Sequence, residues 1–127
     1  MGRKKYGVGI VGTGWVSSQY IKAFQDNPQT NVAAICSRSK ERGEERAREF
    51  GLRDVQIYTD YEEMLGSSSL DIVCLCSPNF LHAEQTIQAA KAGKNIVIEK
   101  PVALNLKDLK EMRDAVRTAK IKTVVGV

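Results

Sequence analysis

The chain has 127 residues, of which 43% are hydrophobic and 27% charged, the balance expected of one globular domain with its own core. The net charge is +4, but basic residues are mixed with acidic ones along the chain, a pattern that argues against nucleic-acid binding. No apolar run reaches the roughly 18 residues that a membrane span requires.

The cysteines give no sign of a metal site. Cys36, Cys74 and Cys76 all lie within apolar runs, and no pair of them has the CxxC spacing of a metal or redox motif. The chain has a single histidine, so few nitrogen ligands are present. We therefore expect buried free thiols, no bound metal and a reducing, cytoplasmic location.

Strand-like and helix-like segments alternate along the chain. The first half contains a predicted strand at Tyr6–Val11, a helix at Trp15–Asp26, a strand at Val32–Cys36, a helix at Lys40–Phe50 and a strand at Val55–Tyr58. Asn27 and Pro28 end the first helix, and Gly51 ends the second. This alternation is typical of a chain that passes repeatedly between a sheet and the helices covering it.

The second half continues the alternation. It contains a short helix ending near Leu65, a strand at Asp71–Cys76, a helix at Phe80–Ala92, a strand at Asn95–Ile98, a helix up to Ala119 and a strand at Lys122–Val127. Asp60 and Glu63 have the spacing of a capping box for the short helix. Asn105 and Asp108 cap the last helix, and Gly93 ends the one before it.

Short apolar strands separated by helices are typical of parallel strands joined by crossover connections. The sequence therefore predicts an α/β fold of the Rossmann type, with a doubly wound, mostly parallel six-stranded sheet in the order 3-2-1-4-5-6. One domain is expected to cover residues 1–127. Such sheets bind ligands at the carboxyl ends of the strands, near the reversal of strand order, so the loops after strands one, two, four and five are the expected binding loops.

Two glycine patterns overlap near the start of the chain. The spacing G-x-G-x-x-G occurs at Gly7, Gly9 and Gly12, but the first two of these glycines fall inside the predicted strand. A phosphate-binding turn requires its glycines after the strand and at the start of the helix. The segment that meets this requirement begins at Gly12-Thr13-Gly14.

Each small residue of that segment has an expected role. Gly12 permits a tight turn, Gly14 lets the backbone approach a pyrophosphate, and Ser17 stands where a third glycine is usual. The backbone N–H groups of Trp15 and Val16 then face the phosphates, assisted by the helix dipole. The alternative is a tight turn that binds no ligand.

The residues after the second strand favour NADP(H). Folds selective for NAD place an Asp or Glu here to bind the ribose 2′-hydroxyl, and no acid occurs between the second strand and Lys40. The Ser37 hydroxyl and the Arg38 guanidinium suit a 2′-phosphate instead, and Lys40 and Arg42 add positive charge. In the alternative interpretation, Ser39 caps the next helix and Arg38 points into water. NAD stays as the second cofactor candidate.

Two further motifs follow the fourth and fifth strands. They are Ser77-Pro78-Asn79-x-x-His82, and Ala92-Gly93-Lys94 leading to Glu99-Lys100-Pro101. With the glycine turn, these motifs resemble those of the N-terminal domain of the glucose–fructose oxidoreductase/inositol dehydrogenase/MocA family. The resemblance extends from Tyr6 to Val127, and the ordered combination is specific although no single motif is.

The resemblance implies the cofactor domain of an NAD(P)-dependent oxidoreductase. It implies that Lys100 is the catalytic lysine, and that Glu99 and the segment Ser77-Pro78-Asn79 line the cofactor. His82 belongs to the same cofactor motif, although a histidine at a helix start is also typical of a structural role. Asn79 suits a helix cap, a ribose contact or both.

A lysine at a strand end has a physical rationale as well. A cation beside the substrate oxygen stabilises alkoxide charge during hydride transfer, and its ammonium group can exchange a proton with that oxygen. The alternative for Lys100, from the residues alone, is a surface lysine in a loop.

The family continues into a second, mostly β-sheet domain that supplies substrate contacts and a His or Asp partner for the lysine. That domain is absent from this chain, so a small-molecule substrate is expected to bind through it. The chain is then part of a larger enzyme, which we favour, a stand-alone module, or one half of a two-chain site. A homo-oligomer stays open.

Three functions stay open on the sequence alone. The favoured one is the cofactor-binding domain of an NADP(H)-dependent oxidoreductase acting on a sugar, polyol or related carbonyl or alcohol, inactive as this chain alone. The second is a non-catalytic nucleotide-binding or sensor module. The third is an enzyme that holds its cofactor tightly for chemistry without net redox change, such as glycoside cleavage.

Overall fold

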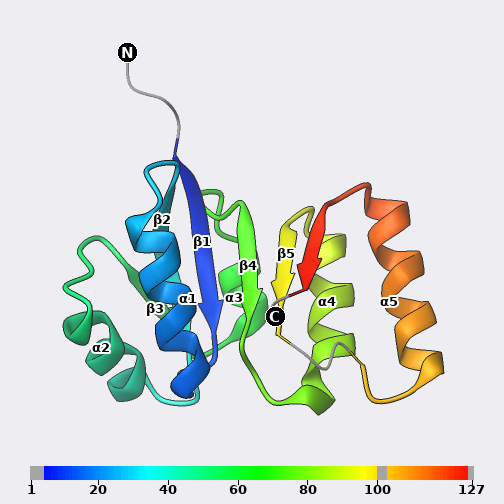
Figure 1. Cartoon of the computed structure of the whole chain (residues 1–127), viewed down its shortest axis with the longest axis horizontal. Helices are drawn as coiled ribbons and strands as arrows, with labels where there is room; N and C mark the ends of the chain where they lie inside the picture. Colours follow the sequence, from blue (N-terminus) through cyan, green and yellow to red (C-terminus); the bar gives the residue numbers. More distant parts are fainter. Residues whose placement is uncertain (1–4, 100–102, 126–127) are drawn as a thin grey trace.

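The computed structural model describes residues 5–99 and 103–125, which form one sheet with helices packed on it (Figure 1). The strands are β1 (Tyr6–Val11), β2 (Thr30–Cys36), β3 (Gln56–Tyr58), β4 (Ile72–Leu75), β5 (Asn95–Ile98) and β6 (Thr123–Val125). The helices are α1 (Trp15–Asp26), α2 (Lys40–Glu49), α3 (Tyr61–Leu65), α4 (His82–Lys91) and α5 (Leu106–Ala119), with a 3₁₀ turn, η1 (Asn79–Leu81), before α4. The alternation predicted from the sequence is confirmed.

The sheet has six strands in the order β3-β2-β1-β4-β5-β6, and each neighbouring pair is parallel. The order reverses between β1 and β4. β2 and β3 are added on one side of β1, whereas β4, β5 and β6 are added on its other side. At the carboxyl end of β1, Val11 pairs with Cys36 of β2 and with Leu75 of β4. The predicted fold class and strand order are confirmed, and the reversal places the ends of these three strands together.

The two faces of the sheet carry separate hydrophobic cores. On one face, Ile21 of α1 and Ala47 of α2 pack against Val8, Ile10 and Ile35. On the other face, Met64 of α3, Ala89 of α4 and Met112 of α5 pack against the sheet, where Val73, Leu75 and Ile96 are buried. Each fully buried aliphatic side chain contributes about 1.5–3 kcal/mol. The central strands are therefore buried on both faces, which explains their nearly continuous apolar runs.

Several strand boundaries differ from the prediction. β3 begins at Gln56 rather than Val55, β4 spans Ile72–Leu75 rather than Asp71–Cys76, and β6 begins at Thr123 rather than Lys122. β2 begins at Thr30 rather than Val32, because Thr30 and Asn31 pair with the start of β1. Thr30 is polar and partly buried and Asn31 is polar and exposed, so the apolar pattern did not reveal them. The strand predicted at Lys122–Val127 is present as β6, and residues 126 and 127 lie outside the described part of the chain.

Helix caps follow the sequence in two cases. The Asn105 side chain accepts a hydrogen bond from the Asp108 N–H at 2.8 Å, which caps α5. The Ser39 hydroxyl accepts from the Arg42 N–H at 3.2 Å, which caps α2. Both bonds occupy N–H groups that the first turn of a helix leaves without an internal partner.

Two other caps differ from the prediction in detail. Asp60 caps α3, but it accepts from the Glu62 N–H at 3.0 Å rather than from Glu63. Asn79 gives α4 no side-chain cap and instead opens the 3₁₀ turn, so α4 begins at His82 rather than Phe80. A tight turn therefore intervenes where the sequence pattern predicted a continuous helix.

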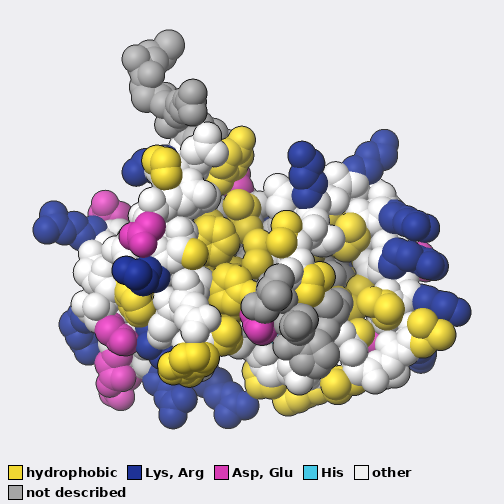
Figure 2. Space-filling view, viewed as in Figure 1, with side chains coloured by type: hydrophobic (Ala, Val, Ile, Leu, Met, Phe, Trp, Pro, Cys, Tyr) yellow, Lys and Arg dark blue, Asp and Glu magenta, His cyan; other side chains and the backbone are white. Residues whose placement is uncertain are grey.

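The face of the molecule seen in Figure 2 carries charges of both signs. On the side seen in Figure 2, Lys and Arg side chains lie around the periphery, including the outer side of α5, and Asp and Glu side chains lie near α1 and α2. The cysteines are free thiols as predicted; Cys36 and Cys74 are buried, whereas Cys76 is only half-buried. Within the described ranges, no helix has the length and apolar character needed to cross a membrane, and no group of three or more metal-binding side chains occurs.

Candidate nucleotide-binding site

A cavity of about 540 Å³ opens at the carboxyl ends of β1, β2 and β4, where the strand order reverses. Many of the predicted site residues line it, namely Gly12, Thr13, Gly14, Ser37, Arg38, Arg42, Ser77 and Pro78. They come from three loops that are far apart in the sequence and, in the case of Arg42, from the first turn of α2. The cavity therefore lies where the sequence predicted a binding site, and the fold brings those loops together.

Gly12 makes the tight turn at the end of β1. Its φ of 99° is in the region that favours glycine, and a Cβ there would lie 2.9 Å from the Cys76 carbonyl oxygen. The Gly12 N–H donates to the Cys36 carbonyl at 2.8 Å, and the Cys76 N–H donates to the Val11 carbonyl at 2.9 Å. The turn is thus pressed against the neighbouring backbone, which leaves no room for a side chain at Gly12.

The start of α1 has the features of an anion-binding site. Both the N–H and the hydroxyl of Ser17 donate to the Gly14 carbonyl, at 3.0 and 2.6 Å. Ser17 is completely buried, which confirms the need for a small residue at this position. The N–H groups of Trp15 and Val16 have no intrahelical acceptor, and the helix dipole adds positive potential there. Because no other heavy atom lies within 4 Å of a Cβ built on Gly14, a phosphate can approach the backbone closely.

The end of β2 supplies positive charge to the cavity. Arg38 and Arg42 are exposed and line it, and none of the described lining residues is acidic. Ser37 is nearly buried, and its hydroxyl donates to the Ser39 carbonyl at 2.5 Å. The serine therefore braces the loop, while the two guanidinium groups are the side chains with freedom to bind an anionic group.

The loop after β4 is held from behind by α4. The Ser77 hydroxyl donates to the Gln85 side-chain oxygen, and the His82 Nε2 lies 2.9 Å from the Ser77 carbonyl oxygen. His82 is completely buried and does not line the cavity. The bond to Ser77 fits the structural role that the sequence had left open for His82, and a direct cofactor contact from His82 stays a prediction.

Glu99 lies at the end of β5, away from this cavity. Its carboxylate accepts a hydrogen bond of 2.5 Å from the Tyr20 hydroxyl of α1. Burial and the bonded Glu99 raise the pKa of Tyr20 above its usual range, so the phenol is a stable donor. Lys100, the predicted catalytic residue, lies outside the described residues. Other predicted residues that do not line the cavity are Trp15, Val16, Ser39 and Asn79.

Several lining residues were missed by the sequence reasoning. Thr59 lies in the loop after β3 and Tyr61 begins α3. The wall is completed by Val11, Cys36, Cys76, Leu81 and Gln85. The Tyr61 hydroxyl donates to the Gln85 carbonyl at 2.7 Å, which joins α3 to α4. The strand order could have revealed the β3 loop, because β3 ends beside β2. β3 is short and only half-buried, so its apolar pattern was too weak to indicate that the loop after it belongs to the site.

Comparison with known proteins adds independent information. Residues 6–127 match a family described as an oxidoreductase family with an NAD-binding Rossmann fold. The chain is 34% identical over 108 residues to scyllo-inositol 2-dehydrogenase (NADP(+)) IolU of Bacillus subtilis (strain 168), covering 85% of this chain and 32% of that protein. It is 34% identical over 111 residues to the 1,5-anhydro-D-fructose reductase of Ensifer adhaerens, covering 87% of this chain and 33% of that one.

Solved structures agree with the sequence comparison. The NAD binding oxidoreductase from Klebsiella pneumoniae matches with a TM-score of 0.87 at 28% identity, over 96% of this chain and 34% of the other. The chain therefore spans about a third of the length of the relatives that it matches.

Proposed function

Since the chain belongs to the oxidoreductase family with an NAD-binding Rossmann fold, we propose that it is the NADP(H)-binding domain of an enzyme that transfers a hydride to or from a sugar, polyol or related carbonyl compound. The observation that carries the cofactor preference is the pair Arg38 and Arg42 on a cavity whose described lining has no carboxylate. A carboxylate in this place would bind a ribose hydroxyl and repel a 2′-phosphate.

The residues of the cavity divide the cofactor between them. In this proposal Gly12, Thr13 and Gly14 hold the diphosphate together with the first N–H groups of α1. Arg38 and Arg42 bind the 2′-phosphate, and the loop at Ser77-Pro78-Asn79 lines the cofactor on the β4 side. Open space at Gly14, where a Cβ would meet no other heavy atom within 4 Å, fits such a ligand.

The redox chemistry comes from the cofactor, which when bound donates or accepts the hydride at its nicotinamide ring. Lys100 is the proposed group that holds or moves the proton on the substrate oxygen, on the strength of the Glu99-Lys100-Pro101 motif. The substrate class follows the two relatives, which by name act on an inositol and on an anhydro sugar. A second domain as substrate partner and a cytoplasmic location belong to the same proposal.

Calorimetric titration of the 127-residue chain with NADPH and NADH tests the cofactor assignment. We expect NADPH to bind at least about tenfold more tightly, since a charge-assisted hydrogen bond contributes about 1.5–3 kcal/mol. Arg38→Ala should weaken NADPH about tenfold and leave NADH within about twofold. Arg48→Ala is the matched control, because Arg48 is exposed on α2 and does not line the cavity. Equal affinities for the two cofactors, unmoved by Arg38→Ala, would refute the assignment.

Turnover tests the catalytic part of the proposal. NADPH oxidation with sugar-derived ketones and aldehydes should be measured on the longest polypeptide that the native reading frame encodes. Lys100→Met should remove most of the activity while leaving the NADPH dissociation constant within a fewfold. Full activity of the Lys100→Met variant excludes the role of Lys100, and cofactor binding without any turnover favours a sensor module.

A further inference from the structure

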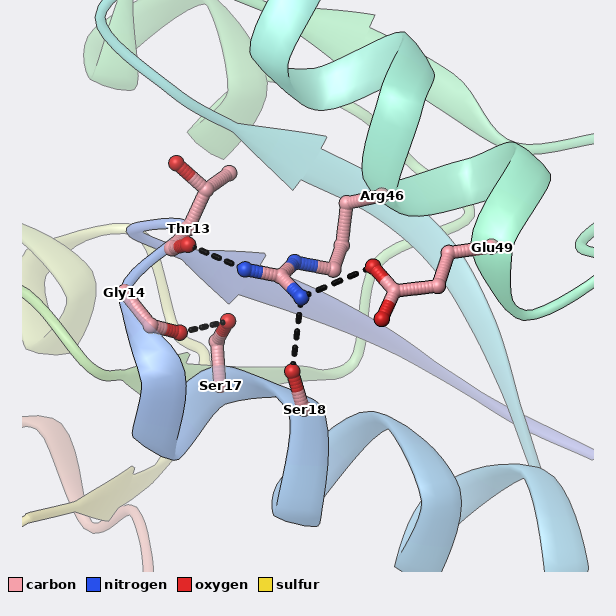
Figure 3. A network of polar contacts seen from close by, with 6 residues as sticks. All are labelled: Thr13, Gly14, Ser17, Ser18, Arg46 and Glu49. Atoms are coloured by element: carbon pink, nitrogen blue, oxygen red, sulfur yellow. Dashed lines mark hydrogen bonds and ion pairs between the residues drawn. The ribbon is translucent and has the colours of Figure 1, made fainter.

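Arg46 reaches from α2 to the glycine turn (Figure 3). Its Nη2 donates to the Thr13 carbonyl at 2.5 Å, and its Nη1 donates to the Ser18 hydroxyl at 2.7 Å and to the Glu49 carboxylate at 2.9 Å. The Arg46 side chain is only 17% exposed, whereas that of Glu49 is 58% exposed. One guanidinium group therefore joins α2, the turn and the first turns of α1.

The bond to Thr13 determines which way a peptide group faces. In a trans peptide unit the C=O and the following N–H point in opposite directions. Because Arg46 draws the Thr13 carbonyl toward α2, the Gly14 N–H is directed away from α2. Gly14 carries no side chain, and no other heavy atom lies within 4 Å of where a Cβ would be, so packing alone does little to prevent rotation of this peptide.

Rotation would matter for an anionic ligand. A rotated Thr13–Gly14 peptide would turn its carbonyl oxygen to the side that now carries the N–H, and a carbonyl oxygen repels phosphate oxygens. A planar guanidinium can donate to Thr13 and Ser18 at once through separate nitrogens, which a lysine ammonium on a flexible stem cannot reproduce with the same geometry.

We propose that Arg46 is a positioning residue that locks the Thr13–Gly14 peptide in the orientation that presents N–H groups to the cofactor diphosphate. This inference rests on the proposed function for its ligand. It gives Arg46 a task different from that of Arg38 and Arg42, which are exposed on the cavity and bind the 2′-phosphate in the proposal above.

Two ligands separate this role from a general effect on the fold. NADPH contains the diphosphate and the 2′-phosphate, whereas 2′-AMP contains only the latter. Arg46→Lys, which keeps the charge, and Arg46→Gln should both raise the NADPH dissociation constant about tenfold, while 2′-AMP binding changes by less than about twofold. Glu49→Gln, the matched control on the same guanidinium, leaves the bonds to Thr13 and Ser18 in place and should change neither. Equal weakening of both ligands, or unchanged NADPH binding, would overturn the proposal.

A ligand-free measurement tests the lock by itself. In amide-resolved NMR spectra of the chain without ligand, the Gly14 signal should shift and broaden in Arg46→Gln, while the Gly93 signal at the end of α4 stays in place. An unchanged Gly14 signal refutes the lock whatever the chain binds. Failure of the wild-type chain to bind NADPH instead removes the proposed function, and with it the diphosphate as the ligand of the locked turn.

Discussion

At the scale of single residues, Gly12 combines two steric demands. Its backbone has a φ of 99°, and a Cβ would lie 2.9 Å from the Cys76 backbone oxygen, directly after β4. Gly51 offers a matched control, because its φ is also positive, at 64°, but a Cβ there meets no other heavy atom within 4 Å.

Gly12→Ala should therefore destabilise the chain more than Gly51→Ala. A positive φ costs an L-residue roughly 1–2 kcal/mol, which is the main penalty for Gly51→Ala. At Gly12 the contact with a rigid backbone oxygen adds to this, so we expect a difference of at least about 1 kcal/mol in the free energy of unfolding. Urea denaturation of both variants measures it, and equal losses would show that the turn relaxes around the methyl group.

Cys36 predicts a pH dependence of stability. Burial, with a smaller contribution from the Asp60 carboxylate, raises the pKa of this thiol from 9.0 to about 11. Between these pH values the unfolded chain releases the proton while the folded chain retains it, so the free energy of unfolding falls as the pH rises. The contribution is fully present below about pH 9 and amounts to roughly 2–3 kcal/mol.

Replacing the thiol should reduce that dependence. Cys36→Ala is less stable at neutral pH because of the lost packing, but its further loss between pH 9 and pH 11 should be smaller than in the wild-type chain. Urea denaturation of both proteins at about pH 8.5 and about pH 11 provides the comparison. At the lower pH the thiol is still protonated in both the folded and the unfolded chain. Parallel losses in the two proteins would mean that Cys36 ionises at the same pH folded and unfolded.

At this scale the sequence could predict residues whose role follows from neighbouring residues in the chain, but not those whose role depends on contacts between distant segments. The glycine turn was placed correctly because Gly7 lies inside a strand, and the structure gives Gly7 a separate reason, since a Cβ there would lie 1.9 Å from the Ser69 carbonyl oxygen. Burial of His82 could not be inferred, because no local pattern reveals that α4 turns its first residue inward. Tyr61 was missed because its part in the site depends on contacts between distant segments.

At the scale of elements, α1 is tied to both of its neighbours at the site. Ser18 receives the bond from Arg46 of α2, and Tyr20 donates to Glu99 at the end of β5. These polar contacts link the start of α1 to segments on either side of the strand-order reversal. We expect α1 to be held in place by these bonds as well as by its buried face.

A double-mutant cycle on Tyr20 and Glu99 tests this linkage. Tyr20→Phe and Glu99→Gln should each cost about 1–2 kcal/mol of stability, because a hydrogen bond to a charged acceptor is lost or weakened. The double variant should be less destabilised than the sum of the two, with a coupling of at least about 0.5 kcal/mol. Strictly additive losses in urea denaturation would show that the 2.5 Å contact contributes nothing to stability.

Element boundaries show where sequence reasoning ends. β1, α1 and β5 were predicted with the limits that the structure has, since apolar runs and helix breakers mark both ends. The start of β2 was missed because Thr30 extends the strand through backbone pairing alone. Pairing of that kind leaves no trace in side-chain polarity.

At the scale of the whole molecule, ligand binding and folding are linked. A ligand that binds only the folded state stabilises that state by about 2.7 kcal/mol when the ligand concentration is a hundred times the dissociation constant. For a chain of this size, NADPH at that concentration should raise the melting temperature by on the order of 10 °C. NADH at the same concentration should raise it less, and Arg38→Ala should bring the two cofactors closer together. Equal shifts from both cofactors would contradict the NADP(H) preference.

The global fold was the most predictable level. Alternation of short apolar runs with helices determines parallel strands, and the handedness of crossovers leaves few ways to order them. The cavity follows from that order, because the strand ends on both sides of the reversal meet there. Packing between loops, as at Arg46, could not be predicted, since the residues that it joins share no pattern in the chain.

Trp15 should make cofactor binding visible by tryptophan fluorescence. It is the single tryptophan of the chain, and its indole is 77% exposed at the first residue of α1, directly after the glycine turn. All of the tryptophan emission therefore originates beside the proposed diphosphate site. Titration with NADPH should quench this emission and sensitise nicotinamide fluorescence by energy transfer. Trp15→Phe should abolish both signals, so the native chain carries its own label for following the cofactor in real time.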